Sequence, residues 1–187
     1  MLRNICARAI FVAVLAGSLH AAEVPRRSPE FAVALPNGKQ ILISEQRGKV
    51  MALLFILTYC AHCQDTVKAL STLQKEYGPR GFQVVATAIE PMAKTMVPDF
   101  VKRFEPAFPV GFNEREQALS YLQHPSNFRL LMPQLVFIDR TGTIRAQYTG
   151  DDPFFGADQE KNLREKIESL LKSGDVKTRK AKGGARK

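Results

Sequence analysis

Two cysteines separated by two residues lie where a predicted strand meets a predicted helix. The apolar run over residues 50–57 ends just before Cys60-Ala-His-Cys63, and the segment that follows, up to Tyr77, has apolar residues at helical spacing. A thiol at a helix N-terminus sees the positive end of the helix dipole and free backbone N–H groups, which stabilise its thiolate. Two thiols at this spacing can also close a reversible disulfide. The placement therefore predicts redox chemistry at the start of a helix.

The rest of the chain alternates between predicted strands and helices. Strands are expected over residues 31–35, 40–43, 50–57, 82–89, 108–112, 134–138 and 143–148, and helices over residues 61–77, 97–104, 114–122 and 159–171. Asn37-Gly38 between the first two strands predicts a β-hairpin, and Pro98 is expected in the first turn of the second helix. This order predicts a layered α/β fold, with a mixed sheet and helices on both of its faces.

The first 22 residues have the features of a secretory signal peptide. A basic start is followed by a short apolar run and then by small residues, which predicts export with cleavage after Ala21 or Ala22. The alternative is a retained membrane anchor, although the apolar run is shorter than the ~20 residues that a membrane span needs. After cleavage only Cys60 and Cys63 remain. A disulfide across so small a loop stabilises a fold little, which favours a reactive dithiol over a structural bridge.

The formal net charge of +9 is concentrated at the C-terminus. The segment Lys172–Lys187 holds seven Lys or Arg residues and one Asp. We expect residues 23–29 to be a polar linker, residues 30–172 to be one domain and residues 173–187 to be a disordered, solubilising tail. Contact of this tail with anionic surfaces is the alternative. No aromatic residues interleave with the charge, so nucleic acid is not an expected partner.

Several motifs together resemble the exported TlpA/ResA-like branch of thioredoxin-fold proteins. They are Gly48-Lys49-Val50 before the central strand, Tyr59 before the two cysteines, Met132-Pro133 before a later strand, and Asp139-Arg-Thr-Gly-Thr-Ile144 as a turn. The resemblance covers roughly residues 28 to 172. It implies a thioredoxin-like fold with an added N-terminal hairpin. It also implies protein thiol or disulfide substrates, an exported or membrane redox partner, and no cofactor besides the Cys60–Cys63 disulfide.

The resemblance also assigns roles around the cysteines. Pro133 is expected to be a cis-proline that faces the disulfide, and the alternative is an ordinary trans proline. The backbone of Met132 would then lie beside Cys60, where it can pair with a substrate strand. Tyr59 stands where relatives usually have Trp, and it is expected to contact substrate as well.

Cys60 is expected to be the nucleophile, because it is placed at the exposed start of the helix, and Cys63, one turn later and less exposed, is expected to be the resolving thiol. His62 lies between them, where an imidazole can stabilise the Cys60 thiolate by charge or hydrogen bonding. The alternative for His62 is a solvated side chain on the first helical turn. The direction of electron flow stays open, because His62 favours an oxidase or isomerase whereas the family favours a specialised reductase.

One acidic residue completes the expected site. Leu54 occupies the position of the buried Asp of thioredoxins, whereas ResA-like proteins carry a Glu elsewhere in the site. Glu90, just after the strand over residues 82–89, is the candidate, and it could accept a proton from Cys63. The alternative is a solvated loop residue before Pro91.

Two other functions are compatible with such a fold. A thiol peroxidase would need a Pro and a Thr or Ser at fixed positions before its reactive cysteine, where this chain has Leu53 and Leu57. A Sco-like copper-binding protein would use the soft thiolates together with a distal ligand, for which His124 is the candidate. A structural zinc site needs four ligands, and this chain has no matching cluster.

Overall fold

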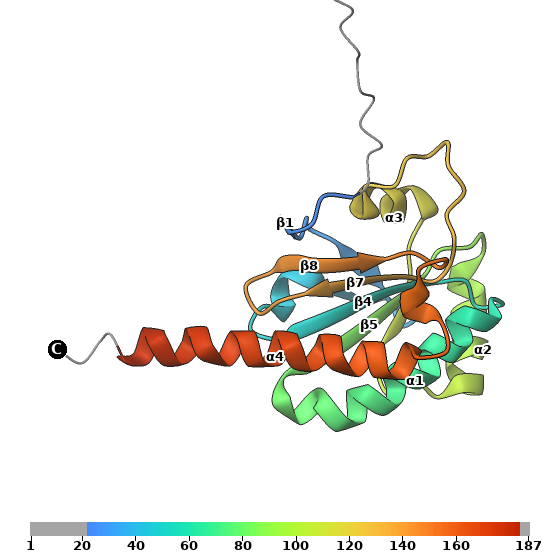
Figure 1. The fold of residues 1–187 in the computed structure, drawn as a ribbon. Helices are drawn as coiled ribbons and strands as arrows, with labels where there is room; N and C mark the ends of the chain where they lie inside the picture. Colours follow the sequence, from blue (N-terminus) through green and yellow to red (C-terminus); the bar gives the residue numbers. More distant parts are fainter. Residues whose placement is uncertain (1–21, 184–187) are drawn as a thin grey trace, which may run out of the picture.

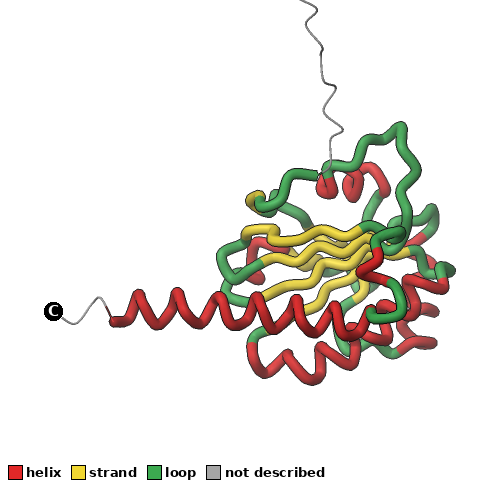
Figure 2. The backbone as a smooth tube through the Cα atoms, viewed as in Figure 1, coloured by secondary structure: helices red, strands yellow, loops and turns green. Residues whose placement is uncertain are grey.

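The computed structural model describes residues 22–183 (Figure 1). The predicted signal peptide up to residue 21, and the last four residues, lie outside this range. The described chain forms a mixed α/β fold, as expected, with an eight-stranded sheet at its centre (Figure 2).

The sheet is built around a parallel centre with antiparallel edges. Its spatial order is β1-β8-β7-β4-β5-β6-β2-β3. In chain order, the strands are β1 Arg26–Arg27, β2 Ala32–Ala34, β3 Gln40–Leu42, β4 Val50–Ile56, β5 Phe82–Ala88, β6 Val110–Phe112, β7 Gln134–Ile138 and β8 Thr143–Tyr148. Strands β4, β5 and β6 run parallel, and the other neighbours pair antiparallel. The predicted N-terminal hairpin is confirmed as β2–β3, which extends the sheet beyond β6.

Helices cover both faces of this sheet. They are α1 Ala61–Tyr77, α2 Ala93–Phe104, α3 Arg115–Leu122 and α4 Gln159–Gly183. Buried residues of α1, α2 and α4 form one core with one face of the sheet, whereas α3 packs into the core on the opposite face. Figure 1 shows α3 on the side of the sheet away from α1 and α4.

Strand β4 lies at the centre of the molecule and leads into the cysteines. All seven of its residues are buried, as the continuous apolar run predicts for a strand covered on both faces. Successive side chains alternate between the two cores, with Leu54 and Ile56 in one and Leu53 and Phe55 in the other. The C-terminal end of β4 is thereby held rigidly from both sides.

Helix α2 differs from the sequence-based prediction. It begins at Ala93 rather than Val97, so Pro98 lies inside the helix and not in its first turn. The first turn is closed by the Met92 carbonyl, which accepts hydrogen bonds from the N–H groups of Thr95 and Met96. Val97 and Phe100 are buried in the core. Burial of this face favours the helix despite the backbone hydrogen bond that Pro98 cannot donate, and the Pro98 side chain itself is exposed.

Two predicted boundaries are also wrong. Residues 23–29 are not a free linker, because β1 pairs with β8 and the Arg26 guanidinium donates hydrogen bonds to the Tyr121 carbonyl and the Gln147 side chain. At the other end, α4 continues to Gly183, into the segment expected to be disordered. The lysines and arginines of that segment are good helix formers and no proline interrupts them.

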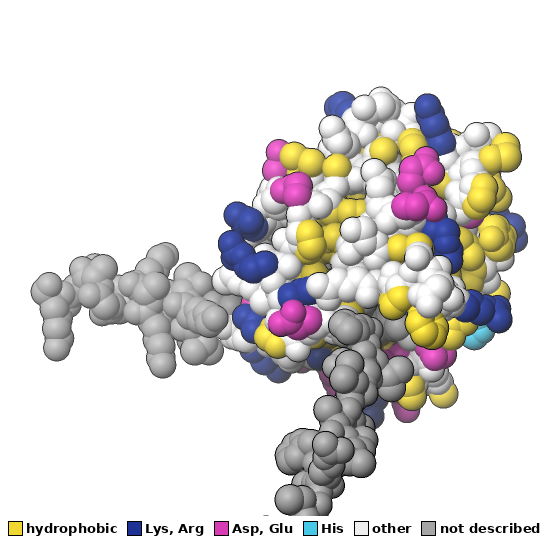
Figure 3. Space-filling model, turned by 90° about the horizontal axis from the view of Figure 1, so that it is seen from above, with side chains coloured by type: hydrophobic (Ala, Val, Ile, Leu, Met, Phe, Trp, Pro, Cys, Tyr) yellow, Lys and Arg dark blue, Asp and Glu magenta, His cyan; other side chains and the backbone are white. Residues whose placement is uncertain are grey.

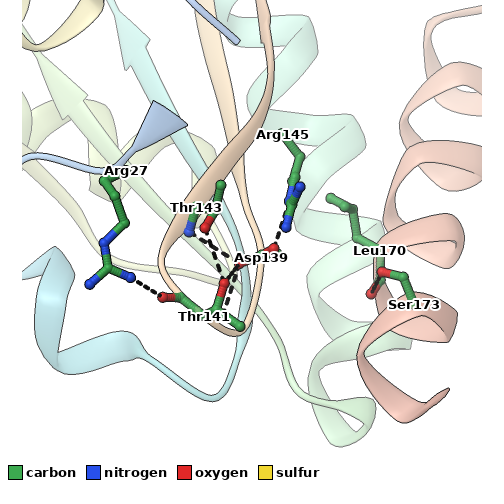
Figure 4. A network of polar contacts seen from close by, with 7 residues as sticks. All are labelled: Arg27, Asp139, Thr141, Thr143, Arg145, Leu170 and Ser173. Atoms are coloured by element: carbon green, nitrogen blue, oxygen red, sulfur yellow. Dashed lines mark hydrogen bonds and ion pairs between the residues drawn. The ribbon is translucent and has the colours of Figure 1, made fainter. Parts of the chain in front are cut away.

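The β7–β8 turn has the form that the motif predicts. The Asp139 carboxylate accepts hydrogen bonds from the N–H groups of Thr141 and Thr143, and from Arg145 Nε at 2.6 Å (Figure 4). Partial burial acts to raise the pKa of Asp139, but these hydrogen bonds outweigh burial and hold the pKa below its usual value. The turn closes the C-terminal end of β7, whose other end begins directly after Pro133.

Candidate functional site

Both cysteines lie at the first turn of α1, as predicted. Cys60 is the N-cap residue, with extended backbone angles, and its Sγ accepts a hydrogen bond from the Cys63 N–H at 3.4 Å. Cys60 is half-buried, whereas Cys63 is fully buried, and both are free thiols in the structure. The helix therefore presents one accessible sulfur and holds the second one beneath it.

The environment of Cys63 disfavours its thiolate. Burial raises the pKa of the Cys63 thiol above its usual value, and the neighbouring Cys60 and the charge of Glu90 raise this pKa further. A backbone hydrogen bond at Leu57 acts in the opposite direction but is weaker than burial. Cys63 therefore needs a proton acceptor close by before it can attack as a thiolate.

Glu90 is buried next to this pair and is not a solvated loop residue. Its side chain is only 5% exposed. Glu90 Oε1 accepts hydrogen bonds from the Thr58 N–H at 2.9 Å and from Thr58 Oγ1 at 2.5 Å. Glu90 Oε2 is buried without a hydrogen-bond partner among the described residues. A buried carboxylate with one unpartnered oxygen is a group that can accept a proton, and the charge of Glu90 acts to raise the pKa of Cys63.

Thr58 and Gln64 belong to the site although the sequence reasoning did not select them. The Gln64 side-chain amide donates to the Thr58 carbonyl at 2.9 Å, and the Gln64 N–H donates to the Cys60 carbonyl. These contacts tie the segment before Cys60 to the first turn of α1. The only feature of the sequence that could have indicated Thr58 is its position, as the first polar residue after a long apolar run.

His62 and Tyr59 both lie on the surface beside the cysteines. The His62 side chain is exposed, and its backbone carbonyl accepts a hydrogen bond from Thr66 Oγ1. Tyr59 is 65% exposed, a high value for an aromatic residue. An exposed ring directly before an accessible cysteine is suited to contact with a partner molecule.

The Met132–Pro133 segment lies at the same end of the sheet. Its peptide bond is cis, as predicted. Strand β7, which follows, pairs antiparallel with β4, and Gln134 at its start faces Phe55 near the end of β4. The β4–β7 register thus brings Pro133 and the cysteine segment to one edge of the fold. Pro133 is buried, whereas Met132 is half-buried.

A shallow groove of about 260 Å³ opens next to Tyr59. Its floor is largely apolar and is formed by α2 side chains. Its lining residues are Thr58, Tyr59, Gln64, Met96, Asp99, Phe100, Arg103 and Phe104. The Arg103 guanidinium lies over the Phe104 ring, 5.2 Å from its centroid. Tyr59, which lines the groove, directly precedes Cys60 in the chain.

The described residues offer little for metal binding or membrane spanning. No three His, Cys, Asp or Glu side chains among them cluster as a metal site would require. His124, the distal copper ligand considered above, has its ring near the Phe128 carbonyl at 3.4 Å. Within the described range, no helix has the length and hydropathy of a membrane span.

Comparison with known proteins agrees with this geometry. The Redoxin family model matches residues 23–167, which is most of the described chain. The chain belongs to the Redoxin family. Within it, the chain is similar to thiol-disulfide oxidoreductase ResA of Geobacillus kaustophilus, with 28% identity over 132 residues that cover 70% of this chain and 71% of the relative. ResA of Bacillus cereus is 24% identical over 130 residues, which cover 69% and 71% of the two chains.

Solved structures share the fold of this Redoxin protein. A putative thiol:disulfide interchange protein DsbE from Chlorobium tepidum superimposes with a TM-score of 0.66 at 25% identity, covering 79% of this chain and 96% of that one. A hypothetical protein from Sinorhizobium meliloti reaches a TM-score of 0.67 at 18% identity, covering 82% and 87%. The protein is therefore a thioredoxin-like thiol-disulfide oxidoreductase of the ResA/DsbE type, with a CxxC pair at the expected position.

Proposed function

We propose that this protein is an exported oxidoreductase that exchanges disulfides with protein substrates through Cys60 and Cys63. The observation that carries the proposal is the pairing of an accessible thiol at the α1 N-terminus with a fully buried thiol one turn later. The helix N-terminus stabilises negative charge on the accessible sulfur. Burial protects the second sulfur until the first has reacted.

In the reductive direction, the reaction has two exchange steps. The Cys60 thiolate attacks a substrate disulfide, forms a mixed disulfide and releases one substrate sulfur as a thiolate. Cys63 then attacks Cys60 Sγ, so the mixed disulfide breaks, the Cys60–Cys63 bond forms and the second substrate sulfur leaves. The substrate gains two electrons and the cysteine pair loses two. The same steps in reverse oxidise a substrate dithiol.

Glu90 is the proposed proton acceptor for Cys63. The environment of Cys63 keeps it protonated, so the second step needs a base. The buried Glu90 carboxylate with its unpartnered Oε2 is suited to this role. A Glu90→Gln substitution keeps the shape and removes the base. We therefore expect it to slow the second step about 100-fold, within the range of general base catalysis, while the first step proceeds.

Substrate contacts are proposed for the exposed surface around Cys60. Tyr59 and the adjoining groove would receive an apolar side chain of the substrate, and the Met132 backbone would pair with its extended chain. His62 would interact with the Cys60 thiolate from the solvent side. Pro133 would fix the Met132 backbone in place.

Features of the N-terminal segment and of the surface support the proposed location and partners. The basic start, apolar run and small residues before Glu23 support export, and an exported or membrane redox protein would then regenerate the pair. Acidic and basic side chains are interspersed on the face in Figure 3, which fits protein partners rather than nucleic acid. The basic residues after Leu171 could contact anionic surfaces. The disulfide itself is the proposed redox group, with no further cofactor.

The reduction potential of the Cys60–Cys63 couple tests this proposal and sets its direction. The mature protein is equilibrated in glutathione buffers, and free thiols are trapped and counted. A reduction potential of about −270 mV, that of thioredoxin, indicates a reductase. A potential of about −120 mV, that of DsbA, indicates an oxidase or isomerase. A pair that does not cycle contradicts the proposal. Cu(I) competition and peroxide consumption assays would then test the copper-binding and peroxidase alternatives.

A further inference from the structure

Thr58 makes an unusual pair of hydrogen bonds to the buried carboxylate. Its backbone N–H and its Oγ1 both donate to the same oxygen, Glu90 Oε1, at 2.9 and 2.5 Å. Thr58 is itself only 7% exposed. Its carbonyl is held by the Gln64 side chain from the first turn of α1. Thr58 therefore links the residue after Cys63 to Glu90 on the far side of the site.

Two donors on one oxygen leave the other oxygen free. Glu90 Oε2 is buried and has no hydrogen-bond partner among the described residues. An unpaired buried polar atom costs free energy, so such atoms are uncommon in folded proteins and call for a reason. Two donors at Oε1 restrict rotation of the carboxylate and keep Oε2 from exchanging places with it. The two Thr58 hydrogen bonds thus hold the carboxylate in one orientation, in which Oε2 is the oxygen without a partner in the described part of the chain.

We propose that Thr58 is a positioning residue, which orients Glu90 so that its unpaired Oε2 takes the proton of Cys63 in the second exchange step. This inference rests on the function proposed above. The hydroxyl contributes a hydrogen bond that Val cannot make and Ser can, whereas the backbone N–H is present in all three. The hydroxyl also lies 4.0 Å from Met96 Sδ in the groove, so Thr58 connects the groove floor to the base.

The test follows single turnovers with a disulfide-containing peptide. The mixed disulfide at Cys60 is trapped by acid at successive times, which gives separate rates for its formation and its resolution by Cys63. We expect Thr58→Val to slow resolution about tenfold, the size of a hydrogen bond to a charged group, and to slow formation much less than resolution. Thr58→Ser should restore resolution to within about twofold of the parent rate.

A double-mutant cycle separates positioning from a general loss of structure. In the Glu90→Gln background, Thr58→Val should have little further effect on resolution, because both changes disable the same proton transfer. Thr87→Val is the matched control: Thr87 is a buried threonine like Thr58, and its Oγ1 donates to Asn113 at 2.8 Å rather than to Glu90. This variant should lose comparable stability and keep the parent resolution rate.

The outcomes distinguish the two proposals. If the parent protein forms and resolves the mixed disulfide but Thr58→Val does so equally fast, the role of Thr58 is disproved and the proposed function stands. Equal slowing by Thr58→Val in the parent and Glu90→Gln backgrounds also disproves it. If the parent itself does not cycle, the proposed function fails. Thr58→Ala replaces the valine variant if thermal unfolding shows that the latter does not fold.

Discussion

At the scale of single residues, the two thiols of one motif differ in their surroundings. Cys60 is half-buried at the N-cap, whereas Cys63, three residues later, has no exposed surface and lies near the Glu90 charge. Helix geometry places the second sulfur one turn further along, on the side that faces the core. This asymmetry assigns different tasks to two chemically identical groups.

The stability of the reduced protein should depend on pH through Cys63. Its folded-state pKa is raised, mainly by burial, so above about pH 8.5 the unfolded chain releases this proton while the folded chain keeps it. The unfolded state then binds fewer protons, and the free energy of unfolding should fall as pH rises from 8.5 to 10. Urea unfolding across this range measures the slope. Cys63→Ala should flatten it, and an unchanged slope would contradict a buried, protonated Cys63.

His62 should tune the reduction potential only slightly. Because its side chain is exposed, its interaction with the Cys60 thiolate is screened by solvent. We expect His62→Ala to make the couple more reducing by about 20 mV or less, which is small compared with the difference between thioredoxin and DsbA. Glutathione equilibration of both proteins measures this. A shift of the size of that difference would instead give His62 the dominant role.

At the scale of elements, the end of β8 supports the segment before β7. A Cβ added at Gly150 would lie 2.3 Å from the Met132 carbonyl oxygen, and the Gly150 N–H donates to the Leu131 carbonyl. Only glycine permits so close an approach between two backbones. The loop after β8 therefore packs directly against the Met132 backbone.

Gly150→Ala should impair exchange with protein substrates by displacing the Met132 backbone. We expect a loss of about 1–3 kcal/mol in the free energy of unfolding and at least about tenfold slower exchange per folded molecule. Gly111→Ala is the matched control, since its Cβ would lie 2.2 Å from the Ala34 carbonyl oxygen, at the β6–β2 edge. It should lose similar stability with little change in exchange. Equal exchange rates for the two variants would contradict a role of the Met132 backbone.

At the scale of the whole molecule, α4 is anchored by its first half. Leu163, Ile167, Leu170 and Leu171 are buried in the core shared with α1. Arg164 adds hydrogen bonds to Glu76 and to Tyr77 Oη, both on α1. Figure 1 shows the remainder of α4 extending past the sheet.

Removal of residues 174–187 should leave the folded body intact. Leu171 is the last core residue of α4 among the residues whose burial the structure describes, so we expect the free energy of unfolding to change by less than about 0.5 kcal/mol and the exchange rate to stay the same. Chemical unfolding and a peptide exchange assay on the shortened chain measure both. A larger loss of stability would show that the basic end of α4 contacts the body.

The sequence predicted the features that depend on residues close together in the chain, and it predicted less well those that depend on contacts between distant residues. The apolar run of β4, the helical spacing of α1 and the Asn-Gly hairpin are local patterns, and each formed the expected element. Helix α2 began earlier than predicted, because Ala93 is buried and the Met92 carbonyl accepts hydrogen bonds from the first turn, ahead of the proline signal at Pro98. The strand β1 was missed because its pairing with β8 joins residues more than 100 positions apart.

The sequence by itself determined that a reactive cysteine pair lies between a strand and a helix, and it determined the fold family. Both depend on residue type and on short spacings along the chain. Only the tertiary structure decided that Glu90 is buried, that Thr58 binds one of its oxygens, and that Gly150 supports Met132. Burial and hydrogen bonding at these positions depend on neighbours from other strands and helices. No local pattern encodes such neighbours, so the chemical environment of the cysteines emerges only when the chain is folded.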